Sequence, residues 1–169
     1  MLSGDGSLPE GEGGVRGRLV LLCGLPGAGK TTVGRRLAAE LPGVRLCPDE
    51  WLLGLGLDPF DGAARDRVER LLWAHAQELL GLGGVVIMEN GFWDRAERDE
   101  LRQRARDLGV AVELRYLAVP VDELHRRVAR RNRERGAVVL TAELLDECVR
   151  MLDVPTEDEL ALFDPALVS

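Results

Sequence analysis

The chain has 169 residues, which is enough for one domain with a full hydrophobic core. Its formal net charge of -7 argues against a dedicated surface for nucleic acid or for an anionic membrane. No apolar run approaches the roughly 18 residues that a membrane-spanning helix needs, and the first residues lack the regions of a signal peptide, so we expect a cytoplasmic protein without a membrane partner.

Residues 1–17 read MLSGDGSLPEGEGGVRG, a stretch that is rich in glycine, proline and acidic residues. Such a segment cannot offset the loss of its conformational entropy by burying apolar surface, so we expect a flexible tail. Residues 18–169 contain no internal repeat and no second linker, and we expect them to form one domain.

From residue 18 onward, short apolar runs alternate with segments of helical periodicity. The predicted helices of the first half carry apolar residues three or four positions apart, and the predicted strands are short and largely apolar. The expected order is a strand over 19–23, a helix over 31–41, a strand over 44–47 and a helix over 63–80.

The second half continues the alternation. Asp94 and Glu97 form a capping-box pattern at the start of a helix, and Gly109 follows its end. Thr141 and Thr156 are expected to cap two later helices, of which the first runs to residue 152. The other expected elements are strands over 85–88 and 110–119 and an arginine-rich helix over 121–134, with a fifth strand left open at 160–163 or 166–168.

Strands that alternate with helices are joined by right-handed crossovers and form a parallel sheet with helices on both faces. The sequence therefore predicts an α/β fold with three layers, α/β/α. Ligands of such folds bind beyond the carboxyl ends of the strands, so functional residues are expected directly after each strand.

The stretch GLPGAGKTT, residues 24–32, matches the pattern GxxxxGK[ST] between a predicted strand and a predicted helix. Its glycines allow backbone N–H groups to point inward around an anion, and the helix start adds its positive dipole end. Lys30, the only lysine of the chain, is expected to contact the β- and γ-phosphates, and Thr31 to bind Mg²⁺. We expect ATP at Gly24, Pro26, Gly27, Ala28, Gly29, Lys30, Thr31 and Thr32.

Acidic and polar residues follow the second and third predicted strands. In LCPDEW, Asp49 is the preferred base for the attacking hydroxyl, although a polar turn or a helix cap is an alternative. In VVIMENGFW, Glu89 takes the place of the usual Walker B aspartate and is expected at the Mg²⁺, with helix capping as the alternative. The expected acceptor site comprises Asp49, Glu50, Trp51, Asn90, Phe92 and Trp93, with Phe60 as a further candidate, and the aromatic residues fit a core role equally well.

The segment HRRVARRNRERG is dense in arginine. Arg127 and Arg131 are four residues apart and share a helical face that can hold a nucleotide between guanidinium groups. Arg133 and Arg135 follow where a loop is expected, from which arginine can reach the transferring phosphoryl group; a solvated basic face is the alternative. The expected catalytic residues are Lys30, Asp49, Arg131 and Arg133, with Arg127 at the nucleotide.

Together these motifs resemble the P-loop kinases of the group that contains chloramphenicol phosphotransferase, zeta toxins, gluconate kinase and polynucleotide 5′-kinase, and most closely the bacterial AAA-domain predicted kinases. The resemblance covers about residues 18–160 and is strongest in GLPGAGKTT. It implies a nucleoside-kinase-like P-loop NTPase with sheet order 2-3-1-4-5 and a short arginine-rich lid. It also implies that Asp49 is the base and that the lid arginines are Arg127, Arg131 and Arg133.

The expected function is Mg²⁺-dependent transfer of the γ-phosphoryl group of ATP to a hydroxyl of a small molecule, a metabolite or an antibiotic, by a monomer or homodimer. One alternative is a polynucleotide 5′-kinase, which the negative net charge of the chain disfavours. Another is a nucleotide-binding ATPase or switch without an acceptor. The chain has no NKxD and no LSGGQ, which disfavours GTPase-type guanine specificity and ABC-type dimerisation.

Overall fold

The computed structural model of the chain describes residues 17–135 and 137–169, so nearly all of the expected tail over 1–17 lies outside the described residues. No helix in these two ranges is long and apolar enough to cross a lipid bilayer. The elements follow in the order β1 (Arg18–Cys23), α1 (Lys30–Glu40), β2 (Val44–Leu46), α2 (Pro48–Gly54), α3 (Gly62–Gly81), β3 (Val85–Gly91), α4 (Arg95–Asp107), β4 (Ala111–Tyr116), α5 (Val121–Arg131), α6 (Ala142–Met151) and α7 (Glu157–Leu160).

The four strands form a parallel sheet in the order β2-β3-β1-β4. This agrees with the expected order for the first four strands, but the described residues contain no fifth strand. The C-terminal segment instead bonds to the open edge of β4, where the N–H of Asp164 donates to the carbonyl oxygen of Val112 at 2.8 Å. The N–H of Val112 donates in return to the Asp164 carboxylate at 2.7 Å. A side-chain oxygen therefore takes the place of the backbone carbonyl that a paired strand would offer.

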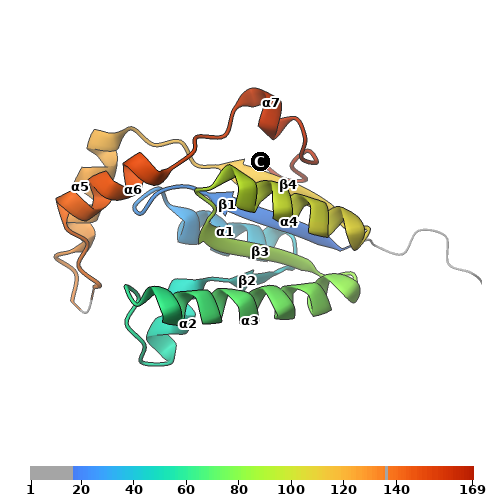
Figure 1. Cartoon of the computed structure of the whole chain (residues 1–169), viewed down its shortest axis with the longest axis horizontal. Coiled ribbons are helices and arrows are strands. Elements are labelled where there is room, and N and C mark those ends of the chain that lie inside the picture. Colours follow the sequence, from blue (N-terminus) through green and yellow to red (C-terminus); the bar gives the residue numbers. More distant parts are fainter. Residues whose placement is uncertain (1–16, 136) are drawn as a thin grey trace, which may run out of the picture.

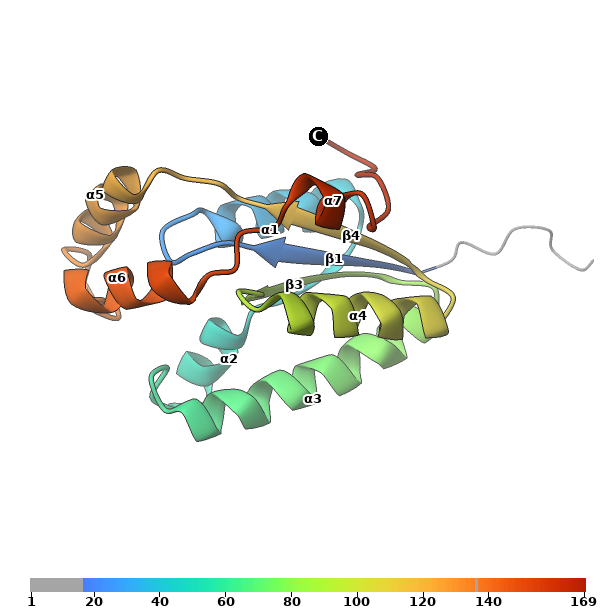
Figure 2. The same ribbon diagram turned by 45° about the horizontal axis from the view of Figure 1, so that its top comes forward.

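Helices cover both faces of the sheet, as strands that are largely apolar and buried require (Figure 1). Leu19 and Leu21 of β1 belong to the core cluster under α3 and α4, whereas Val20 and Leu22 pack with Leu37 of α1 on the opposite face. Figure 2 shows α3 and α4 together on one side of the strands and α1 on the other. The three-layer α/β/α prediction is confirmed.

Helix α2 was not among the expected elements. Pro48 occupies its first turn together with Asp49 and Glu50, an arrangement that suits a helix N-terminus because Pro lacks an N–H and carboxylates favour the positive dipole end. The carboxylates expected in a turn after β2 therefore lie on a short helix, and Cys47 occupies the N-cap position.

The expected caps of the later helices are present. Asp94, Thr141 and Thr156 each accept a backbone N–H bond at the start of α4, α6 and α7. Among the described residues, however, Glu97 makes no return bond to the backbone of Asp94, so the capping box is only half formed. Glu97 lines a cavity instead.

Helices α5 and α6 lie beyond the carboxyl ends of the strands, at the left of Figure 1. They share a second core cluster with the loop between β1 and α1, in which Leu25 and Ala28 pack with Leu124 and Val128 of α5. The loop that carries GLPGAGKTT is therefore held between the end of the sheet and these two helices.

Candidate active site

The loop between β1 and α1 has the geometry of a phosphate-binding loop. Gly27 and Gly29 have φ angles of 84° and 96°, which L side chains rarely adopt. The Lys30 ammonium donates to the carbonyl oxygens of Gly24 at 2.9 Å and Leu25 at 3.0 Å. Burial lowers the pKa of Lys30. A desolvated cation fixed at the start of a helix favours the binding of an anion, because the anion compensates the charge of the ammonium group.

The two groups expected at Mg²⁺ lie together. The Thr31 hydroxyl donates to one oxygen of Glu89 at 3.1 Å, and Arg45 donates to the other at 2.8 Å. Gly34 of α1 makes room for this carboxylate, since a Cβ there would lie 2.1 Å from Glu89 Oε1. No group of three or more His, Cys, Asp or Glu side chains in the described ranges could hold a metal. A hydroxyl and one carboxylate suit Mg²⁺, which takes few protein ligands and completes its shell with water and phosphate oxygens.

Both carboxylates that follow β2 are ion-paired. Asp49 accepts a hydrogen bond from Arg65 of α3, and Glu50 accepts from Arg45 and Arg35. The side chain of Asp49 remains 64% exposed, so its second oxygen is open to a ligand. The partner Arg65 was not identified from the sequence, where it reads as one half of an ordinary i,i+4 pair with Glu69.

A cleft of about 1660 Å³ joins the phosphate loop to the helices on either side of it. This space exceeds that of a typical single-ligand pocket and accommodates two ligands side by side. Sixteen of the residues singled out in the sequence line it: Pro26, Gly27, Gly29, Lys30, Thr31, Thr32, Asp49, Glu50, Phe60, Glu89, Asn90, Phe92, Trp93, Arg127, Arg131 and Arg135.

Four of the expected site residues do not line the cleft. Gly24 and Ala28 shape the loop from behind, where a Cβ on Gly24 would lie 3.2 Å from that of Ala28. Trp51 is 47% exposed on α2, and a spacing of two residues turns it about 200° away from Asp49. Arg133 lies in the turn after α5. The structure therefore does not bring Trp51 and Arg133 to the other candidate residues.

The aromatic pair after β3 is tied to the phosphate loop. Trp93 Nε1 donates to the carbonyl oxygen of Gly24 at 3.0 Å, and Phe92 is 1% exposed with a φ of 49°. The carbonyl oxygen of Phe92 accepts from Arg98 at 2.8 Å, and Arg98 is held by two bonds to Glu159, at 2.6 and 3.0 Å. This strained backbone is therefore fixed by buried contacts.

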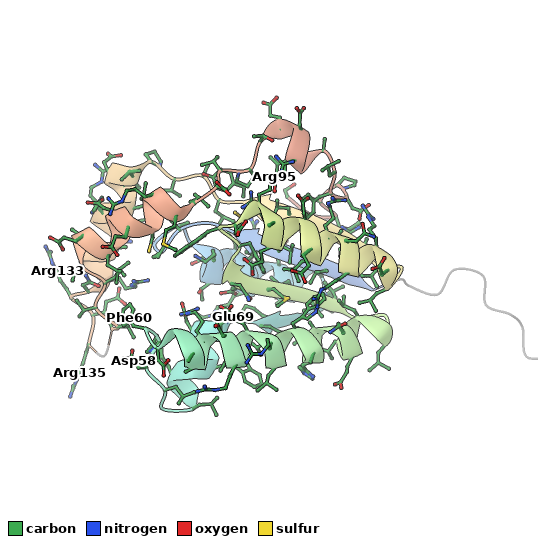
Figure 3. All side chains as sticks on the ribbon, viewed as in Figure 1. Asp58, Phe60, Glu69, Arg95, Arg133 and Arg135 are labelled. Carbon is green, nitrogen blue, oxygen red and sulfur yellow. The ribbon has the colours of Figure 1, made fainter. Side chains whose placement is uncertain are left out.

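Arginines of α5 face the phosphate loop. Arg127 donates to Glu123 at 2.7 Å and to the carbonyl oxygen of Gly27 at 3.4 Å. Arg130 and Arg131 line the same cleft. Figure 3 shows Arg133 and Arg135 on the loop after α5, at the same end of the molecule as the segment before α3 that carries Asp58 and Phe60.

A smaller cavity of about 260 Å³, open to solvent on one side, lies between α3, α4 and the end of β3. Glu69, Asn90 and Glu97 line both this inner cavity and the large cleft, so the two are continuous. Burial, together with the neighbouring Glu69 and Asp94, raises the pKa of Glu97 to about 7. Sequence reasoning missed Glu69 and interpreted Glu97 only as a cap, because carboxylates on a helix are most often solvated.

Comparisons with known proteins bear on the family and the fold of the chain. A family model described as an AAA domain matches residues 19–155. A shikimate kinase from Corynebacterium glutamicum is 33% identical over 129 residues, which cover 73% of this chain and 70% of that protein.

Two solved structures show the same fold. The structure of the Pnkp1/Rnl/Hen1 RNA repair complex contains a similar chain, with a TM-score of 0.71 and 21% identity over 87% of this chain and 46% of that chain. The shikimate kinase from Acinetobacter baumannii in complex with shikimate is similar with a TM-score of 0.58 and 21% identity, over 89% of this chain and 82% of that chain. This chain thus spans less than half of the RNA repair chain, and identities this low show the fold alone.

Proposed function

This chain belongs to the AAA-domain family and has a P-loop kinase fold, and we propose that it transfers the γ-phosphoryl group of ATP to a hydroxyl of a small molecule. The observation that carries the proposal is that one continuous cleft contains both parts of the site. It joins a complete phosphate loop, with Lys30 and the Thr31–Glu89 pair, to a second region lined by Asp49 and Asn90. The kinase relative at 33% identity supports the same reaction.

In this reaction the loop N–H groups and Lys30 hold the triphosphate. Mg²⁺ bound at Thr31 and Glu89 would neutralise phosphate charge during transfer. Asp49 accepts the proton of the acceptor hydroxyl as its oxygen bonds to the γ-phosphorus, and the bond from that phosphorus to the bridging oxygen breaks to release ADP. The bond from Arg65 fixes the orientation of Asp49. Arg131 stabilises the negative charge that spreads over the transferring group.

The composition of the cleft favours a small acceptor over a polynucleotide. Asp49, Glu69, Asp94 and Glu97 line the side away from α5, and this acidic wall repels a phosphate backbone. The likeness to a chain of an RNA repair complex keeps a polynucleotide 5′-kinase as the second candidate. Short oligonucleotides with a free 5′-hydroxyl should not be phosphorylated if the small-molecule assignment is correct.

The proposal is tested by incubating the protein with ATP, Mg²⁺ and a library of hydroxylated metabolites and antibiotics, and detecting by mass spectrometry the gain of one phosphoryl group. Lys30→Ala should abolish nucleotide binding in calorimetry. Asp49→Asn should leave ATP affinity nearly unchanged and lower transfer by about 10²–10⁴-fold. The control Asp107→Asn, at the end of α4 and outside the cleft, should behave as wild type.

Three results would contradict the assignment. One is ATP affinity that is unchanged in Lys30→Ala, and another is transfer at the wild-type rate in Asp49→Asn. The third is ATP hydrolysis that no acceptor in the library accelerates, which would favour a nucleotide-binding ATPase.

A further inference from the structure

The inner cavity between α3 and α4 opens from the phosphoryl-transfer cleft next to the metal-binding pair. Its lining residue Asn90 directly follows Glu89, whose carboxylate accepts from Thr31. The cavity of about 260 Å³ holds roughly eight or nine water molecules, which is the scale of one small ring compound. A molecule seated there therefore lies within reach of the transferred phosphoryl group.

The inner cavity is lined by two carboxylates that have little compensating charge. Glu97 has no ion-pair partner among the described residues, and Glu69 has a single long contact with Arg65, at 3.4 Å. Figure 3 shows Glu69 pointing from α3 into the space below the sheet. Desolvation by burial is the largest cause that raises the pKa of both carboxyl groups. A cation between these two residues would remove that electrostatic cost.

The arginines at the inner cavity do not supply this cation. Arg104 is paired with Glu100 on its own helix, four residues away. Arg70 lines the cavity but is exposed to solvent. Neither forms an ion pair with Glu69 or Glu97 within the described parts of the chain.

Two buried polar atoms at the inner cavity also lack partners. Asn90 Oδ1, a hydrogen-bond acceptor, and Trp73 Nε1, a donor, are both buried without a bond in the described part of the protein. An unsatisfied buried group costs free energy, so a ligand that offers both a donor and an acceptor is favoured. A hydroxyl group offers both. A bare metal ion offers no acceptor for Trp73, and no cluster of three ligating side chains is present among the described residues.

We propose that the inner cavity is the acceptor subsite and that it selects a small polyhydroxylated amine, such as an amino sugar or an aminocyclitol. Its ammonium group lies between Glu69 and Glu97, and its hydroxyl groups bond to Asn90 and Trp73. One further hydroxyl extends toward Asp49 and receives the phosphoryl group. This inference rests on the proposed kinase function, because only then does the cavity hold an acceptor.

The test is calorimetry on the full chain, saturated with Mg²⁺ and a non-hydrolysable ATP analogue, with three probes of similar size. Glucosamine carries one positive charge, glucose none and gluconate one negative charge. Glucosamine should bind about tenfold or more tightly than glucose, since a bond to a charged group is the stronger one, and gluconate should not bind. Glu97→Gln should reduce the affinity for glucosamine to that for glucose.

Matched variants guard against a general loss of structure. Glu78→Gln makes the same change on an exposed part of α3 and should retain the preference for glucosamine. Trp73→Phe keeps an aromatic ring and removes the hydrogen-bond donor. It should lower the affinities for glucosamine and for glucose by the same factor. Glu97→Gln, Glu78→Gln and Trp73→Phe should each bind the ATP analogue as the wild type does. Equal binding of glucosamine and glucose, tighter binding of gluconate, an unchanged preference in Glu97→Gln, or no binding of glucosamine would each overturn the proposal.

The subsite and the kinase function can fail separately. Binding of the three probes is measured without transfer, and it is repeated in Lys30→Ala, where the nucleotide is lost but the cavity is intact. Selective binding of glucosamine with no transfer to any hydroxyl would contradict the proposed function alone. Transfer to a neutral or anionic acceptor would contradict the subsite alone.

Discussion

Glu89 illustrates how a single buried carboxylate is positioned for a phosphoryl-transfer site. Its side chain is 1% exposed, and its oxygens accept from Thr31 on one side and Arg45 on the other. A buried charge without partners would be strongly destabilising, so the pair with Arg45 compensates it. The space for this arrangement comes from Gly34, one turn beyond the phosphate loop.

The role of Gly34 leads to a prediction with a matched control. In an ordinary helix position, Gly→Ala stabilises by about 1 kcal/mol. Gly34→Ala should instead displace Glu89 from Thr31 and weaken Mg²⁺-dependent nucleotide binding by about tenfold, with stability unchanged or lower. Gly81→Ala, where no atom lies within 4 Å of the added Cβ, should raise stability and leave binding intact. Calorimetry with and without Mg²⁺ and urea unfolding measure the two effects, and a more stable Gly34→Ala with full affinity would refute the role.

The pKa of Glu97 gives a pH-dependent prediction. Its pKa is raised from 4.5 to about 7 in the folded chain, so between these values the folded state binds more protons than the unfolded state. Stability that is present below pH 4.5 should therefore be lost as the pH rises through 7. Glu97→Gln should remove this loss. Urea unfolding at pH 4.5, 6 and 8 measures it, and parallel curves for wild type and variant would exclude a raised pKa.

At the scale of elements, α4 and α7 are joined through a buried ion pair. Arg98 is 0% exposed and makes two bonds to Glu159, while its remaining nitrogen donates to the carbonyl oxygens of Phe92 and Trp93. A four-residue helix near the C-terminus therefore fixes the backbone that follows Asn90. Its role is to position the loop after β3, at a distance from the reacting atoms.

Removing one partner of this pair should be costly. Arg98→Met leaves Glu159 buried and uncompensated, and should lower the free energy of unfolding by about 3–5 kcal/mol. The double variant Arg98→Met, Glu159→Leu should recover part of that loss. The exposed pair of Arg104 and Glu100 on α4 is the control, and Arg104→Met should cost less than about 1 kcal/mol. An equal loss of unfolding free energy in Arg98→Met and Arg104→Met would show that burial of the ion pair is unimportant.

The sequence predicted the elements whose signals are local. The helical periodicity of α3, the caps Asp94, Thr141 and Thr156, and the strand–loop–helix context of the phosphate loop all appear as expected. Helix α2 was missed because seven residues are too few to show periodicity. The fifth strand was left open, and the C-terminal segment instead covers β4 through the side chain and backbone of Asp164.

The candidate site divides in the same way. The residues proposed for the nucleotide could be named from the sequence because one contiguous motif contains most of them. The proposed acceptor side depends on Arg65, Glu69 and Glu97, which come from α3 and α4 and meet only through tertiary packing. On a single helix each of these residues is typical of a solvated face, and no local pattern distinguishes it.

For the whole molecule, the phosphate loop is the contact between the sheet and the α5–α6 unit. Leu25 and Ala28 pack against Leu124 and Val128, and Arg127 donates to the carbonyl oxygen of Gly27. An ATP analogue that orders the loop should therefore also order α5, and amide hydrogen exchange over Val121–Arg131 should slow. Exchange over α7, on the far side of β4, should not change. Unaltered exchange in α5 would show that the loop and the helix are not coupled.

Strand β3 also separates the proposed sites of the two substrates, with a consequence for how such proteins diverge. Successive side chains of a strand point to opposite faces, so Glu89 lies against α1 and Asn90 against the inner cavity. After gene duplication, substitutions at Asn90 and at the facing positions of α3 and α4 can alter the choice of acceptor without disturbing the nucleotide side. Selection can thus act on acceptor choice and on use of ATP as two nearly independent traits, encoded by alternate residues of one strand.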